Sequence, residues 1–326
     1  MQNAQNAPLE QTLRDRPDDL ALWCSYGDWL LERGDARGEL ISLEQRHARA
    51  RPADRDALEH QIAAVVAEHK KSWDAALPPG VTVLARRHGF ATKVAVKWSD
   101  HAPVLIGQAL REPFVTGLRI VPPPGPDNRR EVDDWDENYA RARMEGREVD
   151  FSRLSTVDAG ALATLDLGRL SGLDLSYLRI GALGAQALAV SGFFRAQGSG
   201  ATSLPAPAAA GRIEELDLRY SFVGDAGLAA IAASPVFSGV RRLHLQSNAL
   251  SGAGVRSLHG FGRLEELDLR YNQIGAEGAQ ALAEAPFAGS LRRLLLYRSD
   301  VCDDGVSLLA SAPRLPLALR SYWRSA

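Results

Sequence analysis

The sequence contains only two cysteines, Cys24 and Cys302, and they lie far apart in a chain of 326 residues. Two distant cysteines exclude the disulfide framework of a small secreted protein, so both are expected to be reduced thiols. No uninterrupted apolar run reaches the roughly 18 residues that a membrane-spanning helix needs. The first residues also lack the basic and then apolar layout of a secretory signal. We therefore expect a cytoplasmic protein with no membrane partner.

Neither sign of charge is in surplus. The chain has 38 Lys and Arg against 40 Asp and Glu, which gives a formal net charge of −2. A protein that binds nucleic acid through its surface normally carries a basic excess. The composition therefore predicts no nucleic-acid partner.

Recognisable catalytic motifs are missing as well. The seven histidines form no H-E-x-x-H pair and no Cys/His arrangement with zinc spacing. Neither a G-x-S-x-G nucleophile elbow nor a G-x-x-x-x-G-K-[ST] phosphate loop occurs. We expect no catalytic residues, no cofactor and no metal, and an enzyme would have to use dispersed residues.

The chain instead contains five versions of one pattern, which begin at Leu170, Ile213, Val240, Leu264 and Leu291. The first part of each, L-x-x-L-x-L, alternates apolar and polar residues and predicts a strand with one buried face. The second part, typified by I-G-x-x-G-A-x-x-L-A, has its apolar residues at helical spacing. Repeats of this kind predict a solenoid, in which each unit buries its apolar side against its neighbours. A longer first interval contains residues 192–211, a Gly-, Ala-, Ser- and Pro-rich insertion predicted to be flexible.

Residues 264–283, LEELDLRYNQIGAEGAQALA, resemble the repeat of the leucine-rich repeat family in its ribonuclease-inhibitor-like variety. The resemblance implies an α/β fold, a right-handed solenoid with a parallel sheet inside and helices outside. It also implies that an asparagine, here Asn248 or Asn272, bonds the backbone of the turn after the strand. Three copies have Leu178, Ser221 and Ser299 at that position, so looser turns are expected there.

Weaker signatures extend the pattern in both directions. Possible further strands are centred on Val94 and Val96, Leu118 and Ile120, Val149 and Phe151, and, in a C-terminal cap with Trp323, Leu317 and Leu319. We divide the chain into a small α-helical domain at 1–78, degenerate leading repeats with a charged insertion at 79–148, and the repeat array at 149–326. The charged insertion is expected to include a helix with Trp135 and Tyr139. An unrelated α+β segment is the alternative for the upstream repeats.

The N-terminal region has helical spacing of its own. Pro17-Asp18-Asp19 predicts a helix start, which acidic residues stabilise through the helix dipole, and Gly34 predicts its end. Two more helices are expected at residues 37–50 and 54–77. The stretch RPDDLALWCSYGDWLLERGDARGELISLEQ resembles the bacterial repeat-companion domain, a short helical module that precedes repeat arrays. That resemblance brings no biochemical function, and the charged residues after Trp29 are interpreted as structural.

Residues between the strand leucines are predicted to face the open side of the sheet. Acidic and basic pairs alternate from copy to copy at Glu214-Glu215, Arg241-Arg242, Glu265-Glu266 and Arg292-Arg293, so they are expected to pair laterally and hold register. Tyrosines and arginines further along have the composition of interface hot spots. The candidate partner-binding residues are Tyr177, Arg219, Tyr220, His244, Gln246, Arg270, Tyr271, Tyr297 and Arg298.

The leading hypothesis is a non-enzymatic module that binds a protein partner on the concave face of the repeats. The second is an adaptor or inhibitor whose N-terminal helical domain engages another partner. The third is a component of an enzymatic machine. A monomer or one subunit of a hetero-complex is expected, and a pull-down in which partners are lost separately with each domain would distinguish the first two hypotheses.

Overall fold

A computed structural model describes residues 7–123, 157–191 and 212–325. The described residues form two compact units, one within the bounds 1–96 and 104–117 and the other within the bounds 97–103 and 118–326. The predicted insertion at 192–211, the helix with Trp135 and Tyr139, and the strand at Val149 and Phe151 lie outside the described residues. No helix in the described ranges is both long and apolar enough to cross a membrane.

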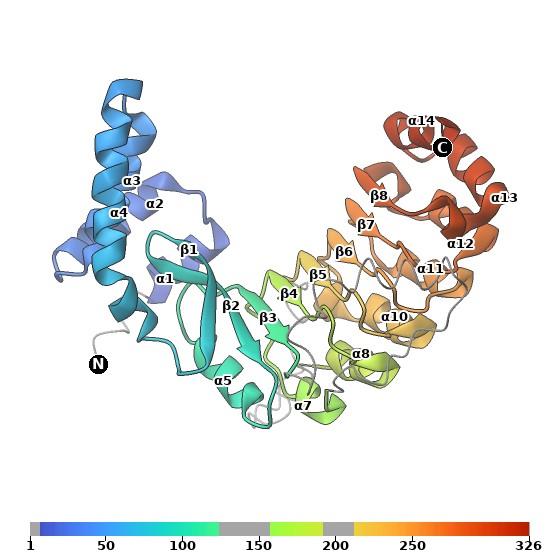
Figure 1. Ribbon diagram of the computed structural model, residues 1–326, viewed down its shortest axis with the longest axis horizontal. Helices are drawn as coiled ribbons and strands as arrows, with labels where there is room; N and C mark the ends of the chain where they lie inside the picture. Colours follow the sequence, from blue (N-terminus) through green and yellow to red (C-terminus); the bar gives the residue numbers. More distant parts are fainter. Residues whose placement is uncertain (1–6, 124–156, 192–211, 326) are drawn as a thin grey trace. The chain divides into compact units, whose positions relative to one another are not determined.

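The N-terminal unit contains helices α1 to α4, a hairpin and most of helix α5 (Figure 1). In chain order its elements are α1 (Ala7–Asp15), α2 (Leu20–Leu31), α3 (Ala36–Arg49), α4 (Pro52–Asp74), β1 (Val81–Arg87) and β2 (Phe90–Lys97), followed by most of α5 (Ala102–Ala109). Asp19 caps α2, since its side chain accepts a hydrogen bond from Leu22 N, and Asp35 caps α3 in the same way from Arg37 N. The predicted helix starts and ends are therefore correct to within a few residues.

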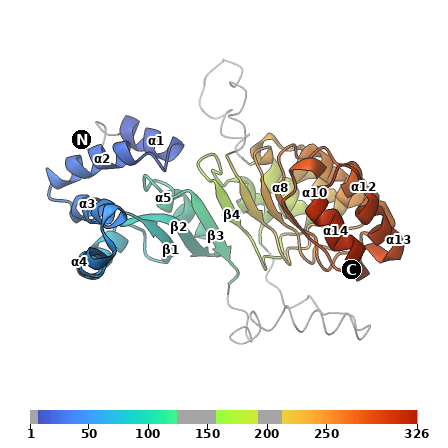
Figure 2. The ribbon, with the colours of Figure 1, turned by 90° about the horizontal axis from the view of Figure 1, so that it is seen from above.

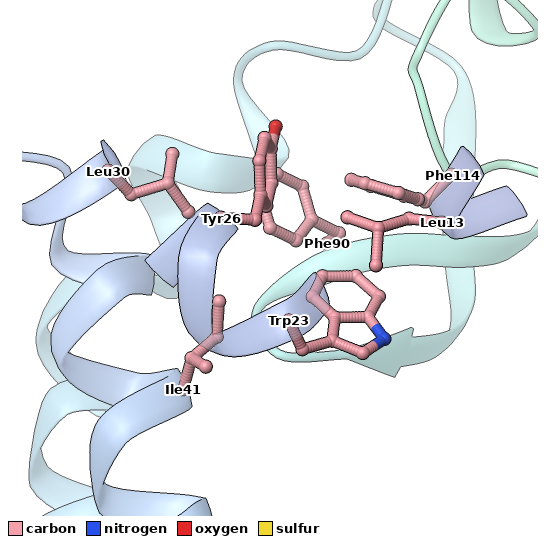
Figure 3. Packing of buried hydrophobic residues seen from close by; sticks show 7 residues of the cluster. All are labelled: Leu13, Trp23, Tyr26, Leu30, Ile41, Phe90 and Phe114. Atoms are coloured by element: carbon pink, nitrogen blue, oxygen red, sulfur yellow. The ribbon is translucent and has the colours of Figure 1, made fainter. Parts of the chain in front are cut away.

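An aromatic core holds this unit together. Trp23 and Tyr26 of α2 are buried with Leu13, Phe90 and Phe114, and Figure 3 shows these side chains pointing toward one another. The rings of Trp23 and Phe114 lie 5.1 Å apart, and those of Phe90 and Phe114 lie 4.8 Å apart. Because Phe90 and Phe114 complete this core, the unit extends beyond the helical domain predicted to end at residue 78.

The charged residues after Trp29 stabilise turns, as the sequence indicates. Arg33 lies over the Trp29 ring at 4.0 Å and donates to the Trp29 carbonyl. Arg37 lies 3.2 Å from Asp35 and 4.4 Å from the Phe90 ring. On α4 the buried residues are Leu58 and Trp73.

Strand β1 does not begin a repeat, because it pairs with β2 in the antiparallel direction. The chain on either side of α5 does show repeat spacing. Thr116 N donates to Thr92 O, and Trp98 N donates to Val121 O, at 3.0 and 2.8 Å. These bonds join residues 24 and 23 positions apart, which matches the spacing predicted between Val94 and Leu118.

The C-terminal unit repeats strand and helix. Its elements are β3 (Gly117–Val121), α7 (Ala159–Ala163), β4 (Gly172–Asp174), α8 (Gly181–Ala189), β5 (Glu215–Asp217), α10 (Gly224–Ala233), β6 (Arg242–His244), α11 (Gly252–Ser257), β7 (Glu266–Asp268), α12 (Gly275–Glu284), β8 (Arg293–Leu295), α13 (Arg298–Ser311) and α14 (Leu317–Ser325). Short 3-10 turns at Pro235–Phe237, Leu258–Gly260 and Ala288–Ser290 follow α10, α11 and α12.

Strands β4 to β8 pair in parallel with equivalent residues in register. The central leucines of the strands are partners, as Leu216 is with Leu243 and Leu243 with Leu267, and all three are buried. In Figures 1 and 2 the strands line one side of this unit, and the helices from α8 to α13 line the other. The repeat pattern thus predicts both the strand direction and the buried face.

Glycines near the helix starts allow neighbouring coils to pack closely. A Cβ on Gly227 would lie 2.9 Å from Ala185 Cβ of the preceding helix, and one on Gly305 would lie 3.1 Å from Ala279 Cβ. Real Cβ atoms are rarely this close to another heavy atom. A glycine at this position therefore lets adjacent helices approach closely.

The two asparagines connect adjacent coils. Asn248 Nδ2 donates to Leu218 O at 2.7 Å, and Asn248 Oδ1 accepts from Val223 N at 3.1 Å. Asn272 Oδ1 in turn accepts from Asn248 N at 3.0 Å. Where serine replaces asparagine, Ser221 Oγ reaches a backbone carbonyl of the preceding coil at 2.9 Å. The predicted asparagine role is confirmed, and it extends across the coil boundary.

The predicted strand at Leu317 and Leu319 is wrong, because these residues belong to helix α14. Leu315, Leu319 and Trp323 recur every four residues, and Leu315 and Trp323 are buried while Leu317 is exposed. This helical spacing overrides the two-residue alternation. Trp323 is buried at the end of the array, where α14 packs on α13.

Candidate functional site

Two arginines are fixed on the sheet by aspartates of their own strands. Arg219 donates through Nε and Nη2 to Asp217, with a shortest distance of 2.7 Å. Arg270 makes the equivalent bonds to Asp268, also at 2.7 Å. The hydrogen bonds to these carboxylates raise the pKa of both guanidinium groups above its ordinary value. In each pair the carboxylate holds the guanidinium in place and balances its charge.

The first tyrosine pair is largely internal. Tyr177 and Tyr220 stack with their ring centroids 4.9 Å apart and 9° between their planes. Tyr220 is only 1% exposed, and its hydroxyl accepts a hydrogen bond from Gln246 Nε2 at 3.0 Å. Gln246 is itself buried. The prediction that Tyr220 and Gln246 face solvent is therefore wrong, since the neighbouring coils cover them.

The second pair is accessible. Tyr297 is 40% exposed and Tyr271 is half-buried. Their hydroxyl oxygens lie 3.3 Å apart and their ring centroids 5.0 Å apart, with Arg270 within 6.0 Å of the Tyr297 ring. We call Arg270, Tyr271 and Tyr297 the exposed tyrosine cluster.

A repeated turn sets the direction of these side chains. Tyr177, Tyr220, Ser247 and Tyr271 all have φ between 54° and 64°, in the left-handed region that residues other than glycine seldom occupy. Each stands directly before the asparagine position. The alternation of a regular strand does not continue through such a turn, which is why exposure at this position could not be predicted from the sequence.

The remaining candidates differ in their surroundings. His244 is half-buried on β6, in register between Asp217 and Asp268 on the adjacent strands. Arg298 is exposed, and its guanidinium lies 2.9 Å from Asp303. In the described part of the chain, no group of three His, Cys, Asp or Glu residues is placed to hold a metal ion.

The family model for the leucine-rich repeat matches residues 264–283. That segment is the coil of β7 and α12, whose strand pairs in parallel with those of the neighbouring copies. Residues 264–283 are a leucine-rich repeat, and the neighbouring copies share its pattern of strand and helix. No curated protein matches it at a significant level.

The leucine-rich repeats also place the alternating charges side by side. Arg242 Nη2 lies 3.1 Å from Glu215, and Arg241 Nη1 lies 2.9 Å from Glu265. Arg292 reaches the same Glu265 at 3.7 Å. Lateral pairing is confirmed, and each half-exposed pair contributes about 0–1 kcal/mol.

Reversing Arg241 and Arg242 to Glu should lower the free energy of unfolding by roughly 1–2 kcal/mol, because two pairs become repulsive. High salt should restore part of this loss, since ions screen exposed charges. Urea denaturation at low and high salt provides the measurement. Arg263→Glu is the control, since Arg263 is exposed and forms no ion pair with a described residue. A loss that salt does not change would show that the ladder charges do not interact.

Sequence reasoning missed Asp300. Its buried carboxylate accepts from Tyr271 N at 3.2 Å and from Tyr297 N at 2.9 Å. Asp300 thereby replaces the missing asparagine of the last coil and positions the exposed tyrosine cluster. The sequence signal that could have identified Asp300 is its place directly after Ser299, the residue at the asparagine position of this copy.

Proposed function

We propose that the chain is a non-enzymatic protein-binding module, and that its partner binds on the sheet face of the leucine-rich repeats at the exposed tyrosine cluster. Leucine-rich repeats generally mediate protein–protein interaction. The supporting observation is that Tyr271 and Tyr297 form an accessible aromatic pair beside a fixed arginine. Tyr and Arg supply a large share of the binding energy at protein interfaces.

The proposal assigns partner contact to fewer residues than the nine candidates predicted from the sequence. Tyr220 and Gln246 are buried, so their role is to support the residues of the surface and not to contact the partner. Arg270, Tyr271, Tyr297 and the neighbouring Arg298 would contact the partner, with Tyr177 and Arg219 at the edge. Because Asp268 and Asp300 hold Arg270 and the tyrosine backbone in place, binding would require little ordering of these groups, which favours affinity.

The test begins with identification of the partner. A photo-crosslinking amino acid at position 297 should capture it, whereas the same group at the exposed Ala229 of α10, on the helix side, should not. Calorimetric titration should then show that Tyr271→Ala with Tyr297→Ala weakens binding at least tenfold, about 1.4 kcal/mol. The melting temperature should stay close to that of the parent.

Leu183→Ala is the matched control, since Leu183 is an exposed side chain of the outer helix α8. It should leave the affinity unchanged. Equal affinity of the double tyrosine variant and the parent would place the binding site elsewhere.

A second candidate function is a two-site adaptor, with a cytoplasmic bacterial repeat-companion domain engaging another partner. The observation in its favour is that the N-terminal unit has its own core and a groove of about 730 Å³ between α3 and α4. Arg46 and Arg49 line this groove. Partners lost separately with each unit in a pull-down would support this function.

A further inference from the structure

The charge ladder of the sheet ends on a basic row. Rows of two glutamates and two arginines alternate from β5 to β8, and each inner row lies between two rows of opposite charge. Strand β8 is the last strand of the sheet in the described residues. Within that part of the chain, Arg292 and Arg293 have the acidic row of β7 on one side and no acidic row on the other.

The acids that follow β8 do not pair with this row. Asp303 pairs with Arg298, and Asp300 accepts from backbone N–H groups. Farther on, residues 305–326 contain Arg314, Arg320 and Arg324 but no Asp or Glu. Arg314 and Arg324 donate to backbone carbonyls, and neither forms an ion pair with a carboxylate in the part of the chain that the structure describes. Arg292 has a side chain that is 79% exposed, and its carboxylate contact among the described residues is Glu265 at 3.7 Å.

An apolar groove lies beside this row. It has a volume of about 410 Å³ and lies between the start of β8 and α14. Leu291, Pro316, Ala318 and Leu319 form its apolar lining, and Arg292 and Glu265 line it as well. A groove of this composition suits an aliphatic side chain next to a carboxylate.

We propose that this C-terminal end of the array binds an acidic segment of a protein partner. Two adjacent carboxylates would pair with Arg292 and Arg293, and a neighbouring leucine-like side chain would enter the groove. The inference rests on the proposed protein-binding function of the sheet face and adds the chemistry of the partner. The apolar groove favours a peptide over a nucleic acid or a membrane surface.

The chain itself indicates a suitable probe. Residues 264–272, LEELDLRYN, supply the acidic row that Arg292 and Arg293 face on their occupied side. A labelled, end-capped peptide of this sequence should bind the full chain at low salt, as measured by fluorescence anisotropy. The neutral peptide LQQLNLRYN should bind at least tenfold more weakly, and added salt should weaken the acidic peptide further.

Two variants separate charge from shape. Arg292→Gln with Arg293→Gln should reduce peptide affinity at least tenfold, because the peptide carboxylates lose both positive partners. Both side chains are exposed, so their loss should leave the core intact. Ala318→Trp should fill the groove and also reduce affinity without any change of charge. Arg263→Gln is the control that should have no effect.

Equal binding of the neutral and acidic peptides would overturn the inference. So would displacement of the peptide by duplex DNA or by phosphatidylserine vesicles at matched charge. Peptide binding that appears only after deletion of the acidic segment 131–137 would show that this segment of the chain, and not a partner, occupies the site. None of these results depends on the Tyr271 and Tyr297 titration, so the two proposals fail separately.

Discussion

Replacing Tyr220 with alanine should destabilise the repeat array by about 3–5 kcal/mol, as for other large buried aromatic side chains. Tyr220 is almost fully buried, stacks on Tyr177, and accepts a hydrogen bond from the buried Gln246. The substitution would leave a cavity between two coils and an amide without its partner. Urea denaturation, with hydrogen exchange of the amides in residues 213–296 to isolate the array, gives the measurement.

Tyr297→Ala is the matched comparison. It removes the same kind of side chain from an exposed position, where substitutions usually change stability by less than about 0.5 kcal/mol. Tyr220→Ala should therefore affect folding and Tyr297→Ala should affect binding. Similar small losses for both variants would show that the first tyrosine pair is not part of the interior.

Asn272→Ala should cost about 3 kcal/mol or more. The Asn272 amide donates to Leu245 O and Leu269 O, both at 2.9 Å. Its oxygen accepts from Asn248 N and Leu250 N, at 3.0 and 3.1 Å. A buried polar group left without a partner costs about 1–3 kcal/mol, and alanine would leave four such groups.

The neighbouring Gln273→Ala supplies the control, since Gln273 is exposed and should tolerate the change. Asn272→Asp keeps the acceptor but loses the donor, so an intermediate loss is expected. Hydrogen exchange should show faster exchange at the amides of Asn248 and Leu250 in the alanine variant. If exchange at these amides stays at the parent's rate, the asparagine does not connect the two coils.

Much of the repeat array could be predicted from the sequence. The period of the leucines indicates strand and helix, and the spacing of the copies indicates parallel pairing of equivalent residues, as Leu216, Leu243 and Leu267 show. The pairing of Arg242 with Glu215 also follows, because lateral neighbours in a parallel sheet lie about 4.8 Å apart. Each of these features depends on residues within one repeat or at equivalent positions of adjacent repeats. The sequence pattern is therefore enough to predict them.

The end of the array was less predictable. Leu317 and Leu319 have strand-like alternation, but two residues are too few to distinguish a strand from a helix. Burial of Trp323 against the preceding coil decides in favour of α14. The N-terminal core likewise depends on Phe90 and Phe114, which are distant in sequence from Trp23.

The sequence by itself determined the leucine-rich coils and the charge ladder, because each depends on the spacing of residues within one repeat or between adjacent repeats. The asparagine bonds were implied by the resemblance of the repeat to the leucine-rich repeat family. Only the tertiary structure decided which tyrosines are accessible. Tyr220 and Tyr271 occupy the same repeat position and share a left-handed backbone, yet one is buried and the other half-exposed. The difference comes from the side chains of neighbouring coils, which cover Tyr220 with Tyr177 and Gln246 and leave Tyr271 beside the open edge at Tyr297.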